Sequence, residues 1–216
     1  MKQTTLHLLF FLFFIVFLLS ATSQSNKAEE LIQQSIQYTL SLSDFEATFN
    51  YQHLSLSRKQ VESKGKIRFK NRKYVIYTED SHIYFNNQSY WVYFPKYNQY
   101  MNYDNNPSQT KSVFSHMNSA FTETGTREYQ GLENTKGIQA HKISIRPTSK
   151  TADFKHAYLW LHTKTLFPIK AVFINKNGSE IIYQFTNFRP NQGISDAEFD
   201  FQHARYPGSQ KIEDND

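Results

Sequence analysis

Asp80, Ser81 and His82 place the three residue types of a hydrolytic triad side by side in the chain. A triad acts only when its base can reach the nucleophile and its acid can orient the base. Residues 81–85, SHIYF, have the composition of a strand, and successive strand side chains point to opposite faces. The three side chains therefore cannot converge, and the segment predicts no nucleophilic site.

No other pattern of residues predicts catalysis or metal binding. The eight histidines form no His-x-His or His-Glu-x-x-His pattern. The sequence has no Gly-x-Ser-x-Gly elbow, and its seven glycines form no phosphate-binding loop. We therefore expect no enzyme activity, no metal and no cofactor. A secreted enzyme that acts on lipids through a site dispersed over several strands is the alternative that these patterns leave open.

Aromatic side chains gather in residues 89–103, SYWVYFPKYNQYMNY, where seven of fifteen positions are aromatic. As a strand, residues 89–94 put Trp91 and Tyr93 on one face, and the opposite face carries Tyr90, Val92 and Phe94. Such a strand is either buried on both faces or lies against an apolar ligand. A sandwich with two filled faces and a cavity that holds a lipid both fit this composition.

Most of the chain beyond residue 43 alternates apolar and polar residues, which predicts strands. The first two, DFEATFNYQ and KGKIRFK, are followed by KYVIYT, SHIYF, QSYWVYF, NQYMNY, QAHKISI, HAYLWLH, FPIKAVFI and EIIYQFTNF. Turn residues separate these segments at hairpin spacing. About ten to eleven strands of this kind predict one antiparallel sheet that curls into an open half-barrel.

Two segments have a helical period instead, so the predicted class is α+β. Residues 27–42, KAEELIQQSIQYTLSL, carry one apolar stripe. Residues 108–121, SQTKSVFSHMNSAF, follow Pro107, which suits the first turn of a helix capped by Asn106. The stripe of this second helix consists of Val113, Phe114, Met117, Ala120 and Phe121. It predicts either a reversible lid over a cavity or an ordinary packed helix.

We expect a cavity wall made by the apolar faces of the first two strands and of the aromatic strand. For the aromatic strand, we choose Trp91 and Tyr93 as the inner pair. The predicted ligand-binding residues are Phe45, Phe49, Tyr51, Ile67, Phe69, Trp91 and Tyr93.

The N-terminus has the features of a secretory signal peptide. Lys2 precedes the apolar run LLFFLFFIVFLL, which is short for a membrane span, and SATS then supplies small residues before Gln24. An uncleaved anchor is the alternative. We expect residues 1–23 to be removed and residues 24–216 to form one exported domain, located in the periplasm.

Net charge and cysteine content further restrict the class of protein to which this chain can belong. The net charge of +5 falls to +4 without residues 1–23, which contain one lysine and no acid. Basic and acidic residues are interspersed, which indicates a solvated surface and no nucleic-acid partner. The lack of cysteine excludes a disulfide-stapled module and a lipoprotein acylated on its own N-terminal cysteine.

In the order of its elements, the chain resembles the LolA-type periplasmic carriers of outer-membrane lipoproteins. The most telling segment is FNNQSYWVYFP at residues 85–95, which resembles the turn, aromatic strand and proline of that family. The other similar segments are LSDFEATF at 42–49, GKIRFK at 65–70, residues 167–187, ISDAEFDF at 194–201 and YPG at 206–208. Together they extend over most of the chain, from about residue 28 to residue 213.

The resemblance implies a monomeric half-barrel, closed by helices, whose apolar cavity holds the acyl chains of a lipoprotein. Its expected partners are acylated lipoproteins, an inner-membrane complex that releases them and an outer-membrane acceptor. Acyl chains need a carrier to cross the aqueous periplasm, because each CH₂ group kept out of water contributes about 0.8 kcal/mol. A lid that opens and closes would let affinity differ between loading and release.

One part of the family pattern is altered. Family members commonly carry Arg-Pro just after the second strand, and that arginine ties the lid through backbone carbonyls. Residues 70–73 read Lys-Asn-Arg-Lys instead, and a shift by one residue reverses the face of a strand side chain. Arg72 is therefore the candidate for the lid clasp, with its role left open.

Two other functions fit the same elements. A lipid- or peptide-sensing domain of the cell envelope would use the cavity without shuttling. In a secreted eukaryotic domain, Asn87 and Asn177 would be glycosylation sites, because each begins an Asn-x-Ser sequence in a predicted turn.

Overall fold

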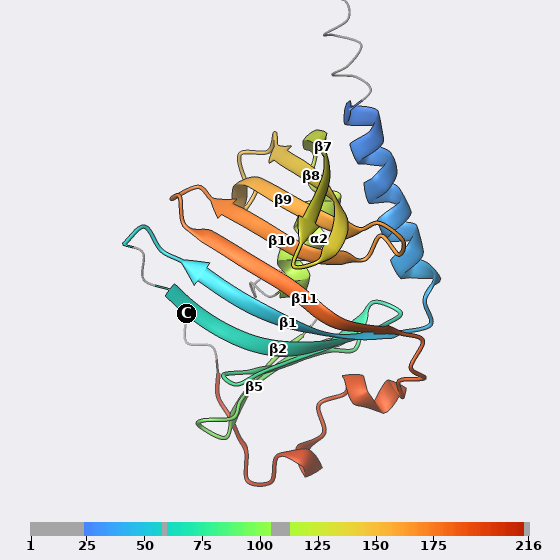
Figure 1. Cartoon of the computed structure of the whole chain (residues 1–216). Coiled ribbons are helices and arrows are strands. Elements are labelled where there is room, and N and C mark those ends of the chain that lie inside the picture. The colour runs from blue at the N-terminus through green and yellow to red at the C-terminus, as the bar shows by residue number, and fades with distance from the viewer. Residues whose placement is uncertain (1–23, 58–59, 105–112, 214–216) are drawn as a thin grey trace, which may run out of the picture.

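The computed structural model describes residues 24–57, 60–104 and 113–213, which form an open, curled β-sheet with the N-terminal helix and a second α-helix over its concave face (Figure 1). The strands are β1 (Phe45–Leu54), β2 (Gln60–Lys70), β3 (Lys73–Thr78), β4 (His82–Phe85), β5 (Ser89–Phe94), β6 (Gln99–Asp104), β7 (Gly125–Thr135), β8 (Ile138–Pro147), β9 (Phe154–His162), β10 (Pro168–Asn175), β11 (Glu180–Pro190) and β12 (Gln210–Lys211). The helices are the N-terminal helix (residues 24–41), α2 (Val113–Thr122) and the short 3₁₀ helices η2 (Asp196–Phe199) and η3 (His203–Arg205). The predicted signal peptide lies outside the described residues, as do Asn106 and Pro107, the expected cap and first residue of the second helix.

The twelve described strands lie in the order β12-β6-β5-β4-β3-β2-β1-β11-β10-β9-β8-β7. Neighbours are antiparallel except β12, which pairs with β6 in parallel. Pairing of β1 with β11 joins the two halves of the chain and sets Phe49 opposite Phe185. Since β7 and β12 end the sheet and do not meet, the described strands stay open. The predicted open half-barrel of the α+β class is confirmed.

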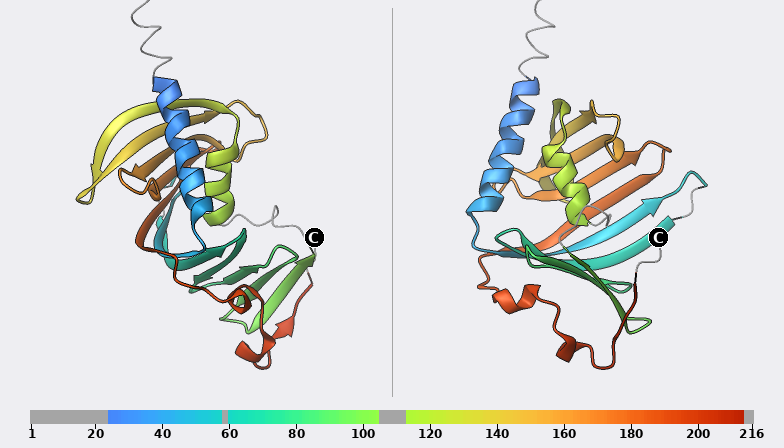
Figure 2. Two further views of the ribbon diagram at one scale, coloured as in Figure 1. Left: turned by 90° about the vertical axis from the view of Figure 1, so that its right-hand side faces the viewer. Right: turned by 180° about the vertical axis from the view of Figure 1, so that it is seen from behind.

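The N-terminal helix and α2 lie next to each other over the concave face of the sheet (Figure 2). The N-terminal helix buries Ala28, Leu31 and Ile32 there, which is the stripe expected from its sequence. Ser35, on the same stripe, donates a hydrogen bond from Oγ to the carbonyl of Leu166 at 2.7 Å. Among the described residues, no helix combines the length and apolar character needed to cross a membrane.

The C-terminal segment, residues 191–213, runs along the convex face below β3 to β6 (Figure 1). Phe199 and Phe201 pack there against Val75, Tyr84 and Tyr93. These strands are therefore buried on both faces, by helices and core on one side and by the C-terminal segment on the other. This arrangement explains how the strands can be aromatic on both faces without exposing them.

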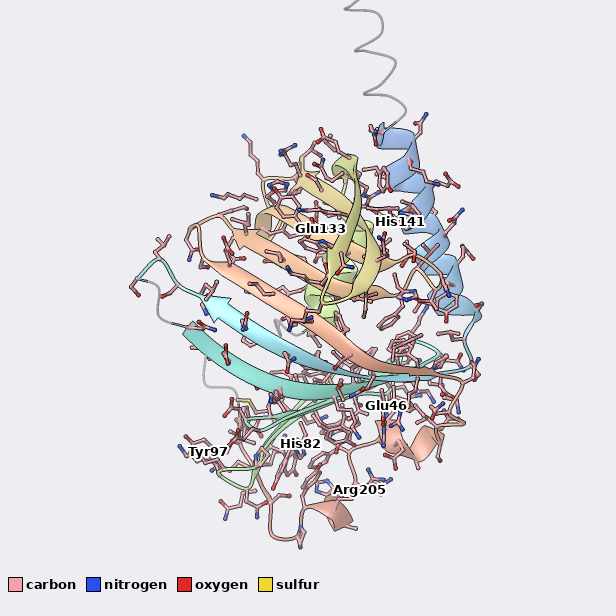
Figure 3. All side chains as sticks on the ribbon, in the orientation of Figure 1. Glu46, His82, Tyr97, Glu133, His141 and Arg205 are labelled. Atoms are coloured by element: carbon pink, nitrogen blue, oxygen red, sulfur yellow. The ribbon has the colours of Figure 1, made fainter. Side chains whose placement is uncertain are left out.

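Buried carboxylates attach the beginning of the C-terminal segment to β1. Asp44 is 2 % exposed and accepts hydrogen bonds from the backbone N–H groups of residues 192, 193 and 194 at 2.6, 3.0 and 3.1 Å. Glu46 pairs with Arg68 at 2.7 Å and with Arg189, and Arg68 also bonds Glu198 of η2 at 2.6 Å. Backbone hydrogen bonds satisfy the Asp44 carboxylate and ion pairs satisfy that of Glu46, as burial of a charge requires. These contacts fix the segment to the convex face (Figure 3).

Gly65 permits the close approach of Phe49 from the neighbouring strand. The two residues are opposite each other in the β1–β2 pair. A Cβ at position 65 would lie 2.3 Å from Cζ of Phe49 and 2.8 Å from the carbonyl oxygen of Tyr77. Glycine is therefore needed for the ring to lie across β2.

The strand β7 was not predicted from the sequence. Its residues, GTREYQGLENT, are mostly polar, and only intermediate or exposed side chains occur along it. A bulge between Tyr129 and Gly131 breaks the alternation further. As an edge strand with little burial, β7 lacks the period of two that marks its neighbours. The short β12 also escaped prediction, because two residues cannot display a period.

Candidate functional site

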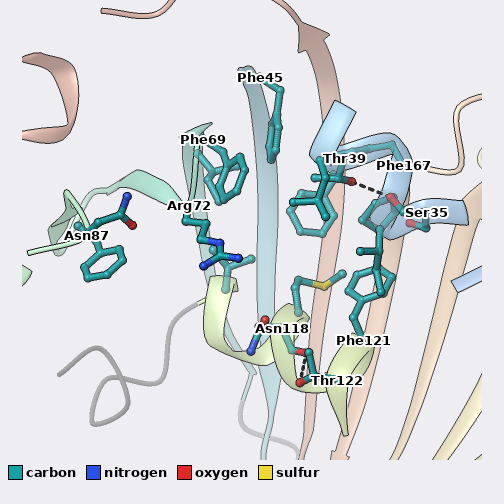
Figure 4. A pocket seen from close by; sticks show the side chains of 18 residues that line it. Ser35, Thr39, Phe45, Phe69, Arg72, Asn87, Asn118, Phe121, Thr122 and Phe167 are labelled. Atoms are coloured by element: carbon teal, nitrogen blue, oxygen red, sulfur yellow. Dashed lines mark hydrogen bonds between the residues drawn. The ribbon is translucent and has the colours of Figure 1, made fainter. Parts of the chain in front are cut away.

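An apolar cavity of about 880 Å³ lies between the two helices and the concave face of the sheet (Figure 4). Its apolar wall is formed by Ile36, Leu40, Phe45, Ile67, Phe69, Phe85, Val113, Met117, Phe121, Phe167, Pro168 and Phe185. The wall combines side chains from the N-terminal helix, α2 and several strands. The volume falls within the range of about 300–1,000 Å³ that is typical of small-molecule sites.

Most polar side chains that line the cavity bond the backbone of the protein itself. Ser35 donates to Leu166 as described, Thr39 Oγ1 donates to the carbonyl of Ser35 at 2.9 Å, and Thr122 Oγ1 donates to the carbonyl of Asn118 at 2.9 Å. Asn87 Nδ2 donates to the carbonyl of Asn71 at 3.0 Å. These donors therefore do not demand a polar ligand inside the cavity.

Three of the predicted ligand-binding residues, Phe45, Ile67 and Phe69, line this cavity. Phe49 and Tyr51 point to the same concave side, but they pack into the core beyond the cavity. Phe49 lies 6.2 Å from the ring of Phe185, and Tyr51 lies 5.4 Å from the ring of Tyr183. That any of these residues binds a ligand remains a prediction.

The family model described as sporulation protein YdcC-like matches residues 1–199. The chain belongs to the YdcC-like family of sporulation proteins. Comparison with curated proteins by sequence gave no match.

Several solved structures are similar to this chain, and the likeness with a TM-score above 0.5 supports its fold. An uncharacterized conserved protein from Thermus thermophilus has a TM-score of 0.60 and 12 % identity, and the match covers 86 % of this chain and 98 % of that one. A DUF1329 family protein from Desulfovibrio piger has a TM-score of 0.49 and 15 % identity, over 85 % and 99 % of the chains. A LolA superfamily protein from Nitrosomonas europaea has a TM-score of 0.43 and 11 % identity, over 82 % and 98 %.

In this protein an open antiparallel sheet, an N-terminal helix and a second helix enclose an apolar cavity, which is the arrangement that the resemblance to LolA-type proteins implied. The family model, however, is named for sporulation and not for lipoprotein sorting.

Trp91 and Tyr93 lie on the convex face, so the choice of this pair as the inner face of β5 is corrected. Trp91 stacks on Phe201 at 6.4 Å, and Tyr93 stacks on Tyr206 at 3.9 Å. The concave side of the strand is instead formed by Tyr90, Val92 and Phe94. Alternation separates these two sets but does not say which set faces the helices, because the C-terminal segment covers the other set with equally apolar rings.

The helix α2 contributes Val113, Met117 and Phe121 to the cavity wall. The side chain of Phe114, which was predicted to belong to the lid, lies outside the described part of the chain. Arg72 also lines the cavity, although its place in the sequence differs from that of the family arginine. It forms no hydrogen bond to a carbonyl of α2 among the described residues.

Arg127 of β7 makes the bonds that were expected of a lid clasp. Its Nη2 donates to the carbonyls of Phe121 and Glu123, at the end of α2, at 2.9 Å each. Its Nη1 donates to Glu29 Oε2 of the N-terminal helix at 2.6 Å. Hydrogen bonds from Gln33 and Arg127 lower the pKa of Glu29, which favours the charged carboxylate beside the guanidinium. Sequence reasoning missed Arg127 because it lies on the one long strand that was not predicted.

Several wall residues also escaped prediction. Ile36 and Leu40 belong to the recognised stripe of the N-terminal helix, which could have assigned them to the cavity. Phe85 ends β4, Phe167 directly precedes β10, and Phe185 lies in the middle of β11. Only the curl of the sheet brings these three positions together under the helices.

The triad residue types of the sequence do not form a site. His82 Nδ1 bonds the hydroxyl of Tyr206 at 2.8 Å, and Ser81 bonds Thr78. A serine–histidine contact does occur on the convex face, where Ser144 Oγ lies 2.8 Å from His156 Nε2. Ser144 is only 2 % exposed, and no described carboxylate bonds His156. Within the described ranges, no group of His, Asp or Glu is placed to hold a metal ion.

Proposed function

We propose that this protein is a non-enzymatic carrier that binds acyl chains in the cavity under α2. The single observation that supports it is the 880 Å³ apolar cavity enclosed by two helices and the curled sheet. An acyl chain of about fourteen CH₂ groups would gain on the order of 11 kcal/mol by leaving water. That gain is an upper value, because binding also restricts the chain and the lid.

The cargo that best fits the family resemblance is an acylated lipoprotein. In this proposal the protein is exported by residues 1–23, receives lipoproteins from a releasing complex at the inner membrane and delivers them across the aqueous periplasm. An acceptor in the outer membrane is a further partner. The family name adds sporulation as the setting in which this transport is to be sought.

The proposal is tested by isolating the protein from exporting cells, including sporulating cells, and by measuring acylated peptides in the bound fraction by mass spectrometry. A parallel assay follows the fluorescence of 1-N-phenylnaphthylamine, an apolar probe. Two exposed leucines give a matched pair: Leu40 lines the cavity mouth and is 59 % exposed, whereas Leu132 of β7 is 58 % exposed and lies away from the cavity.

We expect Leu40→Asp to weaken probe binding several-fold, because a charge is placed where the ligand leaves water. Leu132→Asp should bind as the unmodified protein does. Equal binding by both variants, or the absence of acylated species from the bound fraction, would contradict the proposal. Acylated species that co-purify but do not pass to a second copy of the protein would favour a sensing domain over a carrier.

A further inference from the structure

The mouth of the cavity holds a guanidinium group that has no partner among the described residues. Arg72 lies with Asn71 in the two-residue turn between β2 and β3, and its side chain lines the cavity (Figure 4). Both turn residues have a left-handed backbone, with φ of 49° for Asn71 and 67° for Arg72. This is the geometry of a tight hairpin, so the backbone of Arg72 is held by the strands on either side.

Among the described residues, the other basic side chains around this turn have acidic partners, and Arg72 has none. Lys70 and Lys73 lie 3.5 and 3.2 Å from Asp196 on the convex side, and Arg68 is paired with Glu46 and Glu198. No carboxylate lines the cavity within the described part of the chain. Within the residues that the structure describes, no carboxylate therefore offsets the positive charge of Arg72 at the cavity mouth.

A second hollow of about 250 Å³ adjoins the cavity at this point. It shares Thr39, Leu40, Phe69 and Arg72 with the main cavity and adds Leu42 and Asn71. Half of its lining residues are polar, and none of them is acidic. A molecule that fills the apolar cavity can therefore extend into a smaller polar space beside the guanidinium.

We infer that the site takes an amphiphile whose acyl chain fills the cavity and whose carboxylate or phosphate bonds Arg72 at the mouth. The inference rests on the proposed function and names the class of ligand. The planar fork of a guanidinium matches two oxygens of a carboxylate or a phosphate, and such charge-assisted bonds are stronger than neutral ones. The anion is either the headgroup of a free lipid or an acidic residue beside the acylated terminus of a lipoprotein.

The test measures displacement of 1-N-phenylnaphthylamine by palmitate and by hexadecanol, which share a chain length and differ in charge. Arg72→Asn removes the guanidinium and keeps a residue that tolerates the left-handed backbone. Arg72→Lys keeps the charge. Lys136→Asn is the matched control, because Lys136 is an exposed cation at a left-handed position of the β7–β8 turn, with φ of 51°.

We expect the protein and its Lys136→Asn variant to bind palmitate about tenfold more tightly than hexadecanol at low salt, which corresponds to about 1.4 kcal/mol. Arg72→Asn should abolish this preference and leave hexadecanol binding unchanged, and Arg72→Lys should keep part of it. The preference should weaken as salt is added. Two dipalmitoylated peptides, in which the acylated cysteine is followed by Glu or by Gln, are then compared in the same displacement assay. The comparison distinguishes the two sources of the anion.

Equal affinity of the protein for palmitate and hexadecanol would overturn the inference and leave the proposed function intact. Loss of binding of both palmitate and hexadecanol in Arg72→Asn would also overturn the inference. Arg72 would then maintain the structure of the cavity mouth and not bind the anion. Failure of both ligands to displace the probe would overturn the inference together with the proposed function.

Discussion

Arg127 of β7 and Glu29 of the N-terminal helix form an ion pair at 2.6 Å, while the same guanidinium bonds two carbonyls at the end of α2. One side chain therefore joins both helices that cover the cavity to the edge of the sheet. Arg127 is 14 % exposed, and its Nε has no hydrogen-bond partner among the described residues. This contact is therefore where we expect a single substitution to loosen both covering helices.

Replacing Arg127 by Ala should release α2. We expect a loss of about 1–3 kcal/mol in the free energy of unfolding, because charged and carbonyl groups lose their partner. Hydrogen exchange should increase in α2 and the N-terminal helix, and the apolar probe should enter faster. Arg146→Ala is the control, since Arg146 is an exposed cation of β8 whose nearest described carboxylate lies 3.5 Å away. Unchanged exchange in α2 would show that Arg127 does not hold the lid.

The carboxylate of Glu46 should make the free energy of unfolding depend on pH. Burial acts to raise its pKa, but hydrogen bonds from Arg68 and Arg189 and the charge of Lys66 outweigh burial and lower the pKa from 4.5 to about 2. The folded protein therefore binds this proton less readily than the unfolded chain. The stabilisation is complete above pH 4.5 and is lost as the pH falls from about 4.5 to about 2.

Glu46→Gln removes this dependence. The free energy of unfolding, measured in urea at pH 7 and at pH 3, should fall between these pH values in both proteins. The fall should be larger in the unmodified protein than in the variant, by on the order of 1–2 kcal/mol. Glu62→Gln, at an exposed position of β2, serves as the control. If the free energy of unfolding falls equally in the unmodified protein and in Glu46→Gln, the acid sensitivity arises from groups other than Glu46.

The C-terminal segment should stabilise the sheet without taking part in ligand binding. Phe201 contacts Trp91, Tyr93 and Tyr100 on the convex face, with ring centroids 6.4, 6.3 and 5.0 Å apart. Phe201→Ala should therefore cost about 3–5 kcal/mol and shift the fluorescence of Trp91. Binding of the apolar probe to the folded variant should be unchanged. Weaker binding under conditions in which the variant is fully folded would mean that the convex face influences the cavity.

The approach of Phe49 to Gly65 can be measured as a coupling. Gly65→Ala should destabilise the protein by about 1–3 kcal/mol, because the new methyl group meets the ring of Phe49. In a Phe49→Leu background the same change should cost less, since the shorter side chain leaves space over β2. Additive costs in the double-mutant cycle would show that the two residues do not constrain each other.

The sequence by itself determined most of the elements and their apolar faces, with β7 and β12 as the exceptions. Alternation along β1 and β2 put Phe45, Ile67 and Phe69 on apolar faces, because a strand directs every second side chain to the same side. The stripe of the N-terminal helix was equally evident, since its residues recur with the helical period. From these local patterns follow the class of the fold, its curled sheet and its helical cover.

Only the tertiary structure decided which face of each strand meets the cavity and which arginine bonds the end of α2. Trp91 and Tyr93 could not be assigned from alternation, because a segment more than 100 residues later supplies Phe201 and Tyr206 to cover them. Arg127 could not be found, because an exposed edge strand leaves no periodic pattern in its residues. Burial and charge pairing depend on what the folded chain places opposite a residue, and that partner is remote in the sequence.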